Sequence, residues 1–260
     1  MSLPTLSLTD FRKLSQKFDV PVEIIIRDYA TIAILLLLNK HEALKKLIFK
    51  GGTAVRRVYF PEARFSVDLD FDYLGEQKDI NTIANEFKHI LSKLEEESIG
   101  SIFITSIDEP IITEHWCFFN VHYTAPGLEA MSRIDINAKH SEDYVKRNLC
   151  LLPYSHEKGP ETLTYPLSII LEDKLIAFID RTHAKDLWDI FYLAILKKVK
   201  PRQRLSKILK MSLEKISLVL DLISERDWNL LRYEYLPKEF KHFSRLEVIN
   251  AVREFIRKHF

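Results

Sequence analysis

Two adjacent glycines followed by an alternating run of aspartates constrain this chain more than any other feature of its 260 residues. The chain contains only six glycines, yet Gly51 and Gly52 stand side by side in "LIFKGGTAVRRVYFPEARFSVDLDFDYL". A short apolar run stops at this pair, and the next residues have the apolar spacing of a short helix that ends at Pro61. Residues 65–74 then alternate apolar and polar side chains, which is typical of a strand. The segment predicts a strand, a Gly-Gly turn, a helix and a second strand.

The second predicted strand places its acidic side chains on one face. Asp68 and Asp70 are two positions apart, so at about 3.3 Å per residue their side chains project about 7 Å apart from that face. Mg²⁺ or Mn²⁺ prefers oxygen ligands and shares its coordination sphere with phosphates and water. Asp135 lies on the polar face of another predicted strand and can supply a third carboxylate. Taken alone, an Asp-x-Asp pair is more often a strand-end or turn feature than a metal site.

The glycine pair strengthens the prediction of a site. Backbone N–H groups at a glycine-rich turn that enters a helix bind phosphate. Gly51 and Gly52 permit close approach, Thr53 offers a hydroxyl, and Arg56 and Arg57 follow within the next turn. A lone Gly-Gly-Thr is more simply explained as a tight turn. A phosphate-binding turn that leads directly into a metal-binding strand is a far more specific combination.

The pattern of the remaining sequence divides the chain into a mixed region and a helical one. Four further segments are clear, a helix at 80–97 and strands at 101–107, 115–125 and 131–140. The aromatic residues of the second of these strands are most simply explained as sheet packing. After Pro166 almost continuous helix is expected. We predict an α+β fold with a mixed β-sheet core and flanking helices in residues 1–160, followed by a helical domain in residues 161–260 that completes the active site.

Charge, cysteine content and hydropathy suggest the partners and the compartment. The net charge is +1, but residues 197–260 contain 16 Lys and Arg against 8 Asp and Glu. This surplus of positive charge would suit binding to RNA, and a solvated helix face explains it equally well. Five of these cations are close together, at Lys197, Lys198, Lys200, Arg202 and Arg204. Cys117 and Cys150 lack metal-ligand spacing, which favours the reducing cytoplasm. The longest apolar run, residues 32–38, is too short to span a bilayer, so no membrane partner is expected.

The motifs resemble those of a known family. "GGTAVRR" followed by "RFSVDLDF" is similar to the signature of nucleotidyltransferases, a glycine-rich turn and helix before an Asp-x-Asp strand. With "LIFKGGTA" before it and "LEDKLIAFIDRTHAKDLWDIFYL" after it, the segment resembles the AbiEii/AbiGii toxin family, which includes MenT-type toxins. The resemblance covers about residues 20–196. It implies a nucleotidyltransferase-like fold, release of pyrophosphate from an NTP, and the toxin of a toxin–antitoxin or phage-defence system with a cognate antitoxin protein.

The resemblance also assigns roles to residues of the core. Gly51, Gly52 and Thr53 match the family's nucleotide-phosphate turn. Asp68 and Asp70 match its metal-binding pair, with Ser66 beside them in the nucleotide site. The predicted metal ligands are therefore Asp68, Asp70 and Asp135, and the predicted nucleotide-binding residues of the core are Gly51, Gly52, Thr53, Arg56 and Ser66.

A third block of the resemblance lies in the helical region. It implies that Lys174 contacts the triphosphate and that Asp186 or Asp189, which follow Lys185, is essential for catalysis. The spacing alone allows a plainer interpretation, in which Asp186 and Asp189 belong to an ion-paired surface face opposite a buried apolar stripe. Lys174 lies among apolar residues and could extend its stem over them while its charge stays in water.

The predicted function is Mg²⁺-dependent transfer of a nucleotide from an NTP to an acceptor hydroxyl, for which we expect RNA, such as a tRNA 3′ end. Asp68 and Asp70 are expected to hold the metal, and Asp70, Asp135 or Asp189 to accept the hydroxyl proton. Two other functions use the same residues. A non-catalytic nucleotide- or RNA-binding module would bind nucleotide without metal, and a two-metal nuclease would shorten RNA and would not need the glycine turn.

Overall fold

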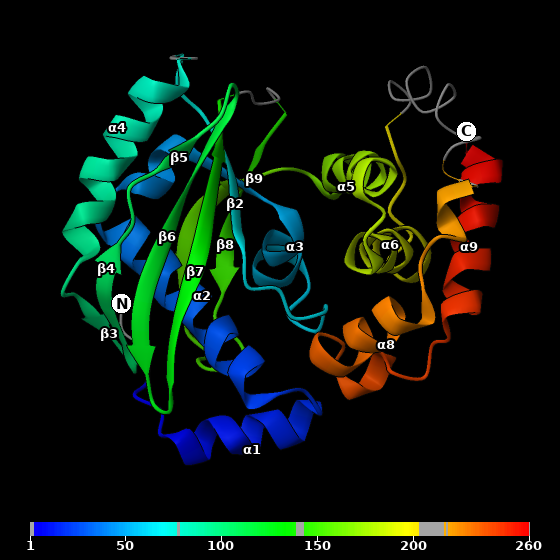
Figure 1. Ribbon diagram of the computed structural model, residues 1–260, viewed down its shortest axis with the longest axis horizontal. Coiled ribbons are helices and arrows are strands. Elements are labelled where there is room, and N and C mark those ends of the chain that lie inside the picture. Colours follow the sequence, from blue (N-terminus) through cyan, green and yellow to red (C-terminus); the bar gives the residue numbers. More distant parts are fainter. Residues whose placement is uncertain (1–2, 77–78, 139–142, 203–215, 217, 260) are drawn as a thin grey trace. The chain divides into compact units, whose positions relative to one another are not determined.

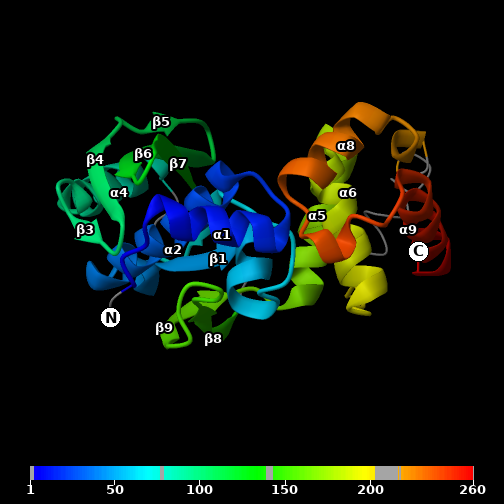
Figure 2. The same ribbon diagram turned by 90° about the horizontal axis from the view of Figure 1, so that it is seen from below.

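The computed structural model describes residues 3–76, 79–138, 143–202, 216 and 218–259, which form two compact units, Met1–Thr164 and Tyr165–Phe260. Figures 1 and 2 show the elements of both units from two directions. The helices of the first unit are α1 (Leu8–Phe18), α2 (Val22–Lys40), α3 (Gly51–Ala54) with its π-helical continuation η2 (Val55–Tyr59), α4 (Ile80–Leu91), and the 3₁₀ turns η1 (Ala43–Lys46) and η3 (Ser92–Leu94).

The strands of the first unit form one mixed sheet. They are β1 (Leu47–Lys50), β2 (Leu69–Tyr73), β3 (Ser98–Ile99), β4 (Ile102–Ile107), β5 (Ile111–Ile112), β6 (Trp116–Ala125), β7 (Leu128–Asn137), β8 (Val145–Cys150) and β9 (Lys158–Thr164). The order is β3-β4-β6-β7-β2-β1-β9-β8, and β5 pairs with β6. β2 runs parallel to β7 and antiparallel to β1. This mixed sheet with flanking helices confirms the predicted α+β class.

One face of the sheet makes the core of the first unit. Phe119 of β6, Ile134 of β7 and Leu69 of β2 lie side by side in register and are buried. Helix α2 packs along the sheet against β7 and is apolar around most of its circumference, and α1 packs across α2 (Figures 1 and 2). A capping box between Ser7 and Asp10 begins α1. The other face, which we call the polar face, carries Lys50, Asp70, Asp135, Phe118 and Arg133 by the same register.

The predicted strand at 65–74 is wrong in its first part, because pairing begins only at Leu69. The physical reason is the end of β1 at Lys50, directly opposite Asp70, where the chain turns into α3. The residues before Leu69 therefore have no β1 partner. The predicted short helix begins earlier than expected, at Gly51, and ends at Tyr59 ahead of Pro61.

The second unit is helical in the residues that the structure describes. Its elements are α5 (Leu167–Arg181), α6 (Ala184–Phe191), the π-helical η4 (Tyr192–Leu196), α8 (Glu225–Glu234), the 3₁₀ turn η6 (Lys238–Phe240) and α9 (Arg245–His259). Trp188 of α6 is fully buried, and its ring lies 6.1 Å from that of Trp228 and 5.6 Å from that of Phe240. An aromatic cluster thus joins α6, α8 and η6. No helix in the described parts of either unit is long and apolar enough to cross a membrane.

Candidate functional site

The glycine turn and the aspartate strand meet at one point of the sheet. Lys50, the residue before the turn, is the register partner of Asp70, and Asp70 is in turn the partner of Asp135. Gly51 has φ +76°, a backbone conformation that side chains disfavour. A Cβ at Gly51 would lie 2.2 Å from Oδ2 of Asp70, so only glycine leaves room for this carboxylate. The two features that stand out in the sequence are therefore parts of one structure.

Gly52 makes a second close approach. A Cβ at this position would lie 2.7 Å from Nη2 of Arg64 and 3.0 Å from Oγ of Ser66. Arg64 and Ser66 are both buried, and Nη1 of Arg64 donates to the carbonyl of Phe65 at 3.0 Å. The turn thus lies against a carboxylate at Gly51 and against a guanidinium and a hydroxyl at Gly52. The structure brings the predicted Ser66 to this turn, and Arg64 is a neighbour that the sequence analysis did not select.

Thr53 and Arg56 are used inside the fold. The Thr53 hydroxyl is fully buried and donates to the carbonyl of Asp68 at 2.5 Å, which ties α3 to the chain that enters β2. Arg56 is also fully buried: Nε donates to Oδ1 of Asp28 at 3.0 Å, and the guanidinium lies 3.8 Å from the ring centroid of Phe65. This placement corrects the expectation that Arg56 reaches nucleotide. Its guanidinium stabilises the core beneath the turn, and we leave Arg56 out of the site.

Asp28 of α2 is the buried partner of two arginines. Arg57, which is fully buried as well, contacts the other carboxylate oxygen of Asp28, and the Tyr154 hydroxyl donates to it at 2.8 Å. Burial raises the pKa of Tyr154 well above its ordinary value, and the Asp28 charge adds to this. This network holds η2, which continues the turn helix, against α2. A single aspartate inside the apolar helix pattern of residues 21–46 was the signal that could have revealed it.

The carboxylates of the polar face differ in exposure. Asp68 is exposed, whereas Asp70 and Asp135 are half-buried. Burial raises the pKa of Asp135 and the nearby Asp68 charge adds to the rise, while Arg133 and Lys50 oppose it. Arg133 donates to Oδ1 of Asp135 through Nε at 3.0 Å and Nη2 at 2.6 Å. Asp135 therefore carries a fixed cationic partner, which the sequence analysis did not foresee.

The oxygen-rich donor set fits a hard divalent cation. Register places Asp70 and Asp135 on adjacent strands, about 4.8 Å apart, and Asp68 lies near enough to influence Asp135. Within the described ranges, no three His, Cys, Asp or Glu residues are spaced as a complete metal-binding group. Mg²⁺ is commonly bound by one or two carboxylates together with substrate phosphates and waters.

The second unit holds the other predicted residues in a buried charge cluster. Nζ of Lys174 lies 3.0 Å from Oδ1 of Asp186 and 2.9 Å from Oδ2 of Asp189. Arg181 donates to Asp186 through Nε at 2.7 Å. Burial alone would raise the pKa of Asp186, but Lys174 and Arg181 hold it at about 2. The alternative of an ion-paired surface face is wrong, because Lys174, Asp186 and Asp189 are all buried.

In the basic segment that follows η4, Arg202 is bound within the second unit, whereas two lysines are exposed. Glu172 of α5 is buried and accepts from the backbone N–H of Arg202 at 2.7 Å and from its Nε at 2.9 Å. Lys198 and Lys200 are exposed, and Lys197 lies 5.2 Å from the ring centroid of Tyr192. Arg204 lies outside the described residues. Lys185 lies 3.7 Å from the ring centroid of Tyr235.

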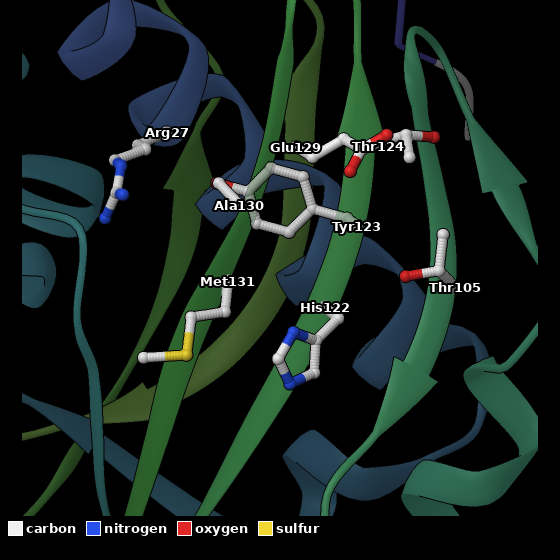
Figure 3. Close-up of a pocket in the computed structure, with 8 residues that line it drawn as sticks. All are labelled: Arg27, Thr105, His122, Tyr123, Thr124, Glu129, Ala130 and Met131. Carbon is white, nitrogen blue, oxygen red and sulfur yellow. The ribbon is translucent and has the colours of Figure 1, made fainter.

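A separate cavity opens on the sheet of the first unit. Its volume is about 500 Å³, and it is lined by Arg27, Thr105, His122, Tyr123, Thr124, Glu129, Ala130 and Met131 (Figure 3). His122 and Met131 are register partners on β6 and β7. The predicted site residues line none of this cavity, and the predicted site is defined instead by the turn and the carboxylates.

The chain matches one family in sequence and resembles two solved structures in fold. The chain matches the family described as "Nucleotidyl transferase AbiEii toxin, Type IV TA system" over residues 34–248. The solved structure of JHP933 from Helicobacter pylori is similar in fold, with a TM-score of 0.54 and 19% identity over 85% of this chain and 90% of that one. An H. pylori protein described as a candidate nucleotidyltransferase aligns with a TM-score of 0.53 and 19% identity over 84% of this chain and 92% of its own. The search of curated proteins found no match.

Proposed function

Because the chain belongs to the AbiEii family of nucleotidyl transferase toxins, we propose that this nucleotidyltransferase requires Mg²⁺ or Mn²⁺ and transfers a nucleotide from an NTP to a hydroxyl of RNA, such as a tRNA 3′ end. The family belongs to type IV toxin–antitoxin systems, so an NTP substrate and an antitoxin counterpart go with it. We also propose that the protein acts in the cytoplasm, where NTPs and tRNA are available. The observation that carries the proposal is the meeting of Gly51 with Asp70.

The first unit supplies the residues that we propose for phosphates and metal. Gly51 and Gly52 begin α3 directly after β1, and backbone N–H groups at such a turn can donate to phosphate oxygens. Asp68 and Asp70 would hold the cation, with Asp135 beside them on β7. Bound Mg²⁺ or Mn²⁺ supplies positive charge that offsets the negative charge of the phosphates during transfer.

The transfer itself is an in-line displacement at phosphorus. The oxygen of the acceptor hydroxyl forms a bond to the α-phosphorus, and the bond from the α-phosphorus to the bridging oxygen breaks. Pyrophosphate takes the electron pair of the broken bond, and the hydroxyl proton passes to a carboxylate. Asp70 and Asp135 are the candidates for this base in the first unit, and positioning by the chain accounts for most of the rate enhancement.

For the second unit, we propose that Lys174 serves the triphosphate and that Asp186 and Asp189 hold its ammonium group in position. The distances of 3.0 and 2.9 Å from Nζ to these two carboxylates support this division of labour. The ammonium group of lysine is a compact positive charge with three donors, which suits the oxygens of a phosphate.

The test is labelling of RNA by the purified protein. Wild type, Asp70→Ala and the matched control Asp108→Ala, an exposed acid of the same unit, are incubated with Mg²⁺, total RNA and each α-labelled NTP, and the RNA is resolved on a denaturing gel. Label in RNA with wild type and control, but not with Asp70→Ala, supports the proposal. Equal labelling by Asp70→Ala would show that Asp70 is not a required ligand of the metal. RNA shortening without label would indicate a nuclease.

A further inference from the structure

The polar face carries an aromatic pair beside the carboxylates. This pair has no role in the proposed transfer reaction. The rings of Trp116 and Phe118 on β6 are stacked, with centroids 5.5 Å apart and planes inclined by 21°. The guanidinium of Arg133 lies 3.8 Å from the centroid of Phe118 and 5.4 Å from that of Trp116. We call these three residues the stacking platform.

The stacking platform is not part of the core. Cys117 and Phe119, which alternate with the platform residues along β6, are fully buried, whereas Trp116 and Phe118 are half-exposed. Sheet packing, the interpretation that the sequence favoured for this aromatic run, applies only to the buried set. The side chain of Arg133 keeps 39% of its surface exposed.

We propose that the stacking platform binds the terminal base of a single-stranded RNA acceptor, an inference that rests on the proposed function. Phe118 is the register partner of Asp135, so the platform adjoins the carboxylates directly. Unpaired bases stack on aromatic rings and on arginine planes, and this platform offers both.

The order of the strands favours the acceptor over the NTP as the source of the base. The sequence of strands is β6-β7-β2-β1, and the glycine turn follows β1. The carboxylates of β7 and β2 therefore lie between the platform and the turn. In-line displacement requires the attacking oxygen and the leaving pyrophosphate on opposite sides of the phosphorus. With the leaving phosphates at the turn, the attacking hydroxyl comes from the side of the platform.

The geometry of Arg133 suits a flat group at this position. Arg133 is paired with Asp135 at 2.6 Å, and this pair fixes the guanidinium beside the ring of Phe118. A base can stack on the guanidinium plane without disturbing the pair.

The test uses a short single-stranded RNA whose 3′-terminal base is 2-aminopurine, because stacking on protein quenches its fluorescence. Wild-type protein should quench the probe, and Trp116→Leu should weaken binding about 5- to 150-fold. Trp116→Tyr keeps an aromatic ring and should restore most of the quenching. The matched control is Phe103→Leu, the same kind of change at an exposed aromatic residue of β4.

A second measurement separates this proposal from the proposed function. Mg²⁺-dependent binding of a fluorescent NTP analogue is recorded for the same variants, and it should be equal in wild type and Trp116→Leu. Unchanged RNA quenching in Trp116→Leu, or an equal loss in Phe103→Leu, overturns the platform while the NTP site stands. A wild-type protein that binds no NTP with Mg²⁺ overturns the proposed function, whatever the RNA probe does. Quenching lost in both Trp116→Leu and Trp116→Tyr would point to a structural role and also overturns the platform.

Discussion

The carboxylate of Asp70 lies in the space that a side chain on Gly51 would need, with Oδ2 2.2 Å from the position of that missing Cβ. The two residues are far apart in sequence, but the antiparallel pairing of β1 with β2 places them together. A turn that can approach phosphate and a carboxylate that can hold a cation are therefore built as one element. Several measurable consequences arise from this and from the buried charges of both units.

Replacing Gly51 with alanine should reduce both stability and transfer. Alanine at φ +76° costs about 1–2 kcal/mol from backbone strain, and the clash with Asp70 adds to it. Urea unfolding and RNA labelling measure the two effects. The matched control is Gly127→Ala, at φ +80° between β6 and β7, where the added Cβ would lie 3.1 Å from the side chain of Leu8. This variant should lose stability from the same backbone strain and keep transfer. Equal transfer by both variants would contradict the coupling of the turn to the site.

The Asp70→Asn substitution should weaken metal-dependent NTP binding without unfolding the protein. An amide keeps the shape of the carboxylate and removes the charge that attracts Mg²⁺. A fluorescent NTP analogue titrated at several Mg²⁺ concentrations measures this, and chelation by EDTA should abolish binding to wild type. Asp108→Asn, at an exposed acid that follows β4, should behave as wild type. Metal-independent binding to wild type would support a non-catalytic module.

The charge cluster of the second unit should give stability that acid removes. Lys174 and Arg181 hold the pKa of Asp186 at about 2, below its ordinary 3.8, so the unfolded chain binds more protons between these values. The stabilisation of about 2 kcal/mol is complete above about pH 4 and is lost as the pH falls towards 2. Urea unfolding followed by tryptophan fluorescence should show a smaller acid loss in Asp186→Asn. Asp221→Asn, exposed on the same unit, should match wild type.

Tyr154→Phe should destabilise the first unit through its buried charges. The substitution removes the hydroxyl that donates to Asp28 at 2.8 Å and leaves this carboxylate with fewer partners beside Arg56 and Arg57. We expect a loss of about 1–3 kcal/mol in thermal or urea unfolding. Tyr144→Phe, at an exposed tyrosine, should change stability by less than about 0.5 kcal/mol. Equal stability of the two variants would mean that the buried network contributes little.

The lysines that follow η4 should contribute to RNA affinity mainly through charge. Replacing Lys197, Lys198 and Lys200 with glutamine should reduce the slope of log affinity against log salt by about 2 for single-stranded RNA. Filter binding across a salt series measures it. The control exchanges three exposed lysines of the first unit, Lys13, Lys17 and Lys93. An unchanged slope in the first set would rule out this segment as an RNA contact.

The local pattern of the sequence predicted the elements around the site well. The alternation in β6 and β7 and the glycine turn are short-range signals, and each appears in the structure at nearly the expected residues. β8 and β9 were not predicted, because β8 has adjacent charged residues and no strong alternation, and β9 contains glycine and proline. Their pairing with each other and with β1 depends on contacts distant in sequence.

The partners of buried charges could not be predicted from spacing. Arg56 follows the glycine turn and so suggested a phosphate ligand, but its partner Asp28 lies on another helix. Lys174 was predicted to contact the triphosphate or, in the plainer interpretation, to keep its charge in water, but the sequence did not show that its Nζ lies beside two aspartates of α6. In both cases the sequence located the residue, and tertiary packing decided which atoms it meets.

The register of β2 limits how this region can change in length. β2 is paired on both sides, with β1 and with β7, and its side chains alternate between the core and the polar face. Deletion of one residue inside the strand would turn Asp70 and Asp72 towards the core and bring Leu69 or Phe71 to the polar face. Loss of two residues would keep the alternation and only shorten the strand. Within β2, therefore, only a change of even length keeps the remaining side chains on the faces that they now occupy.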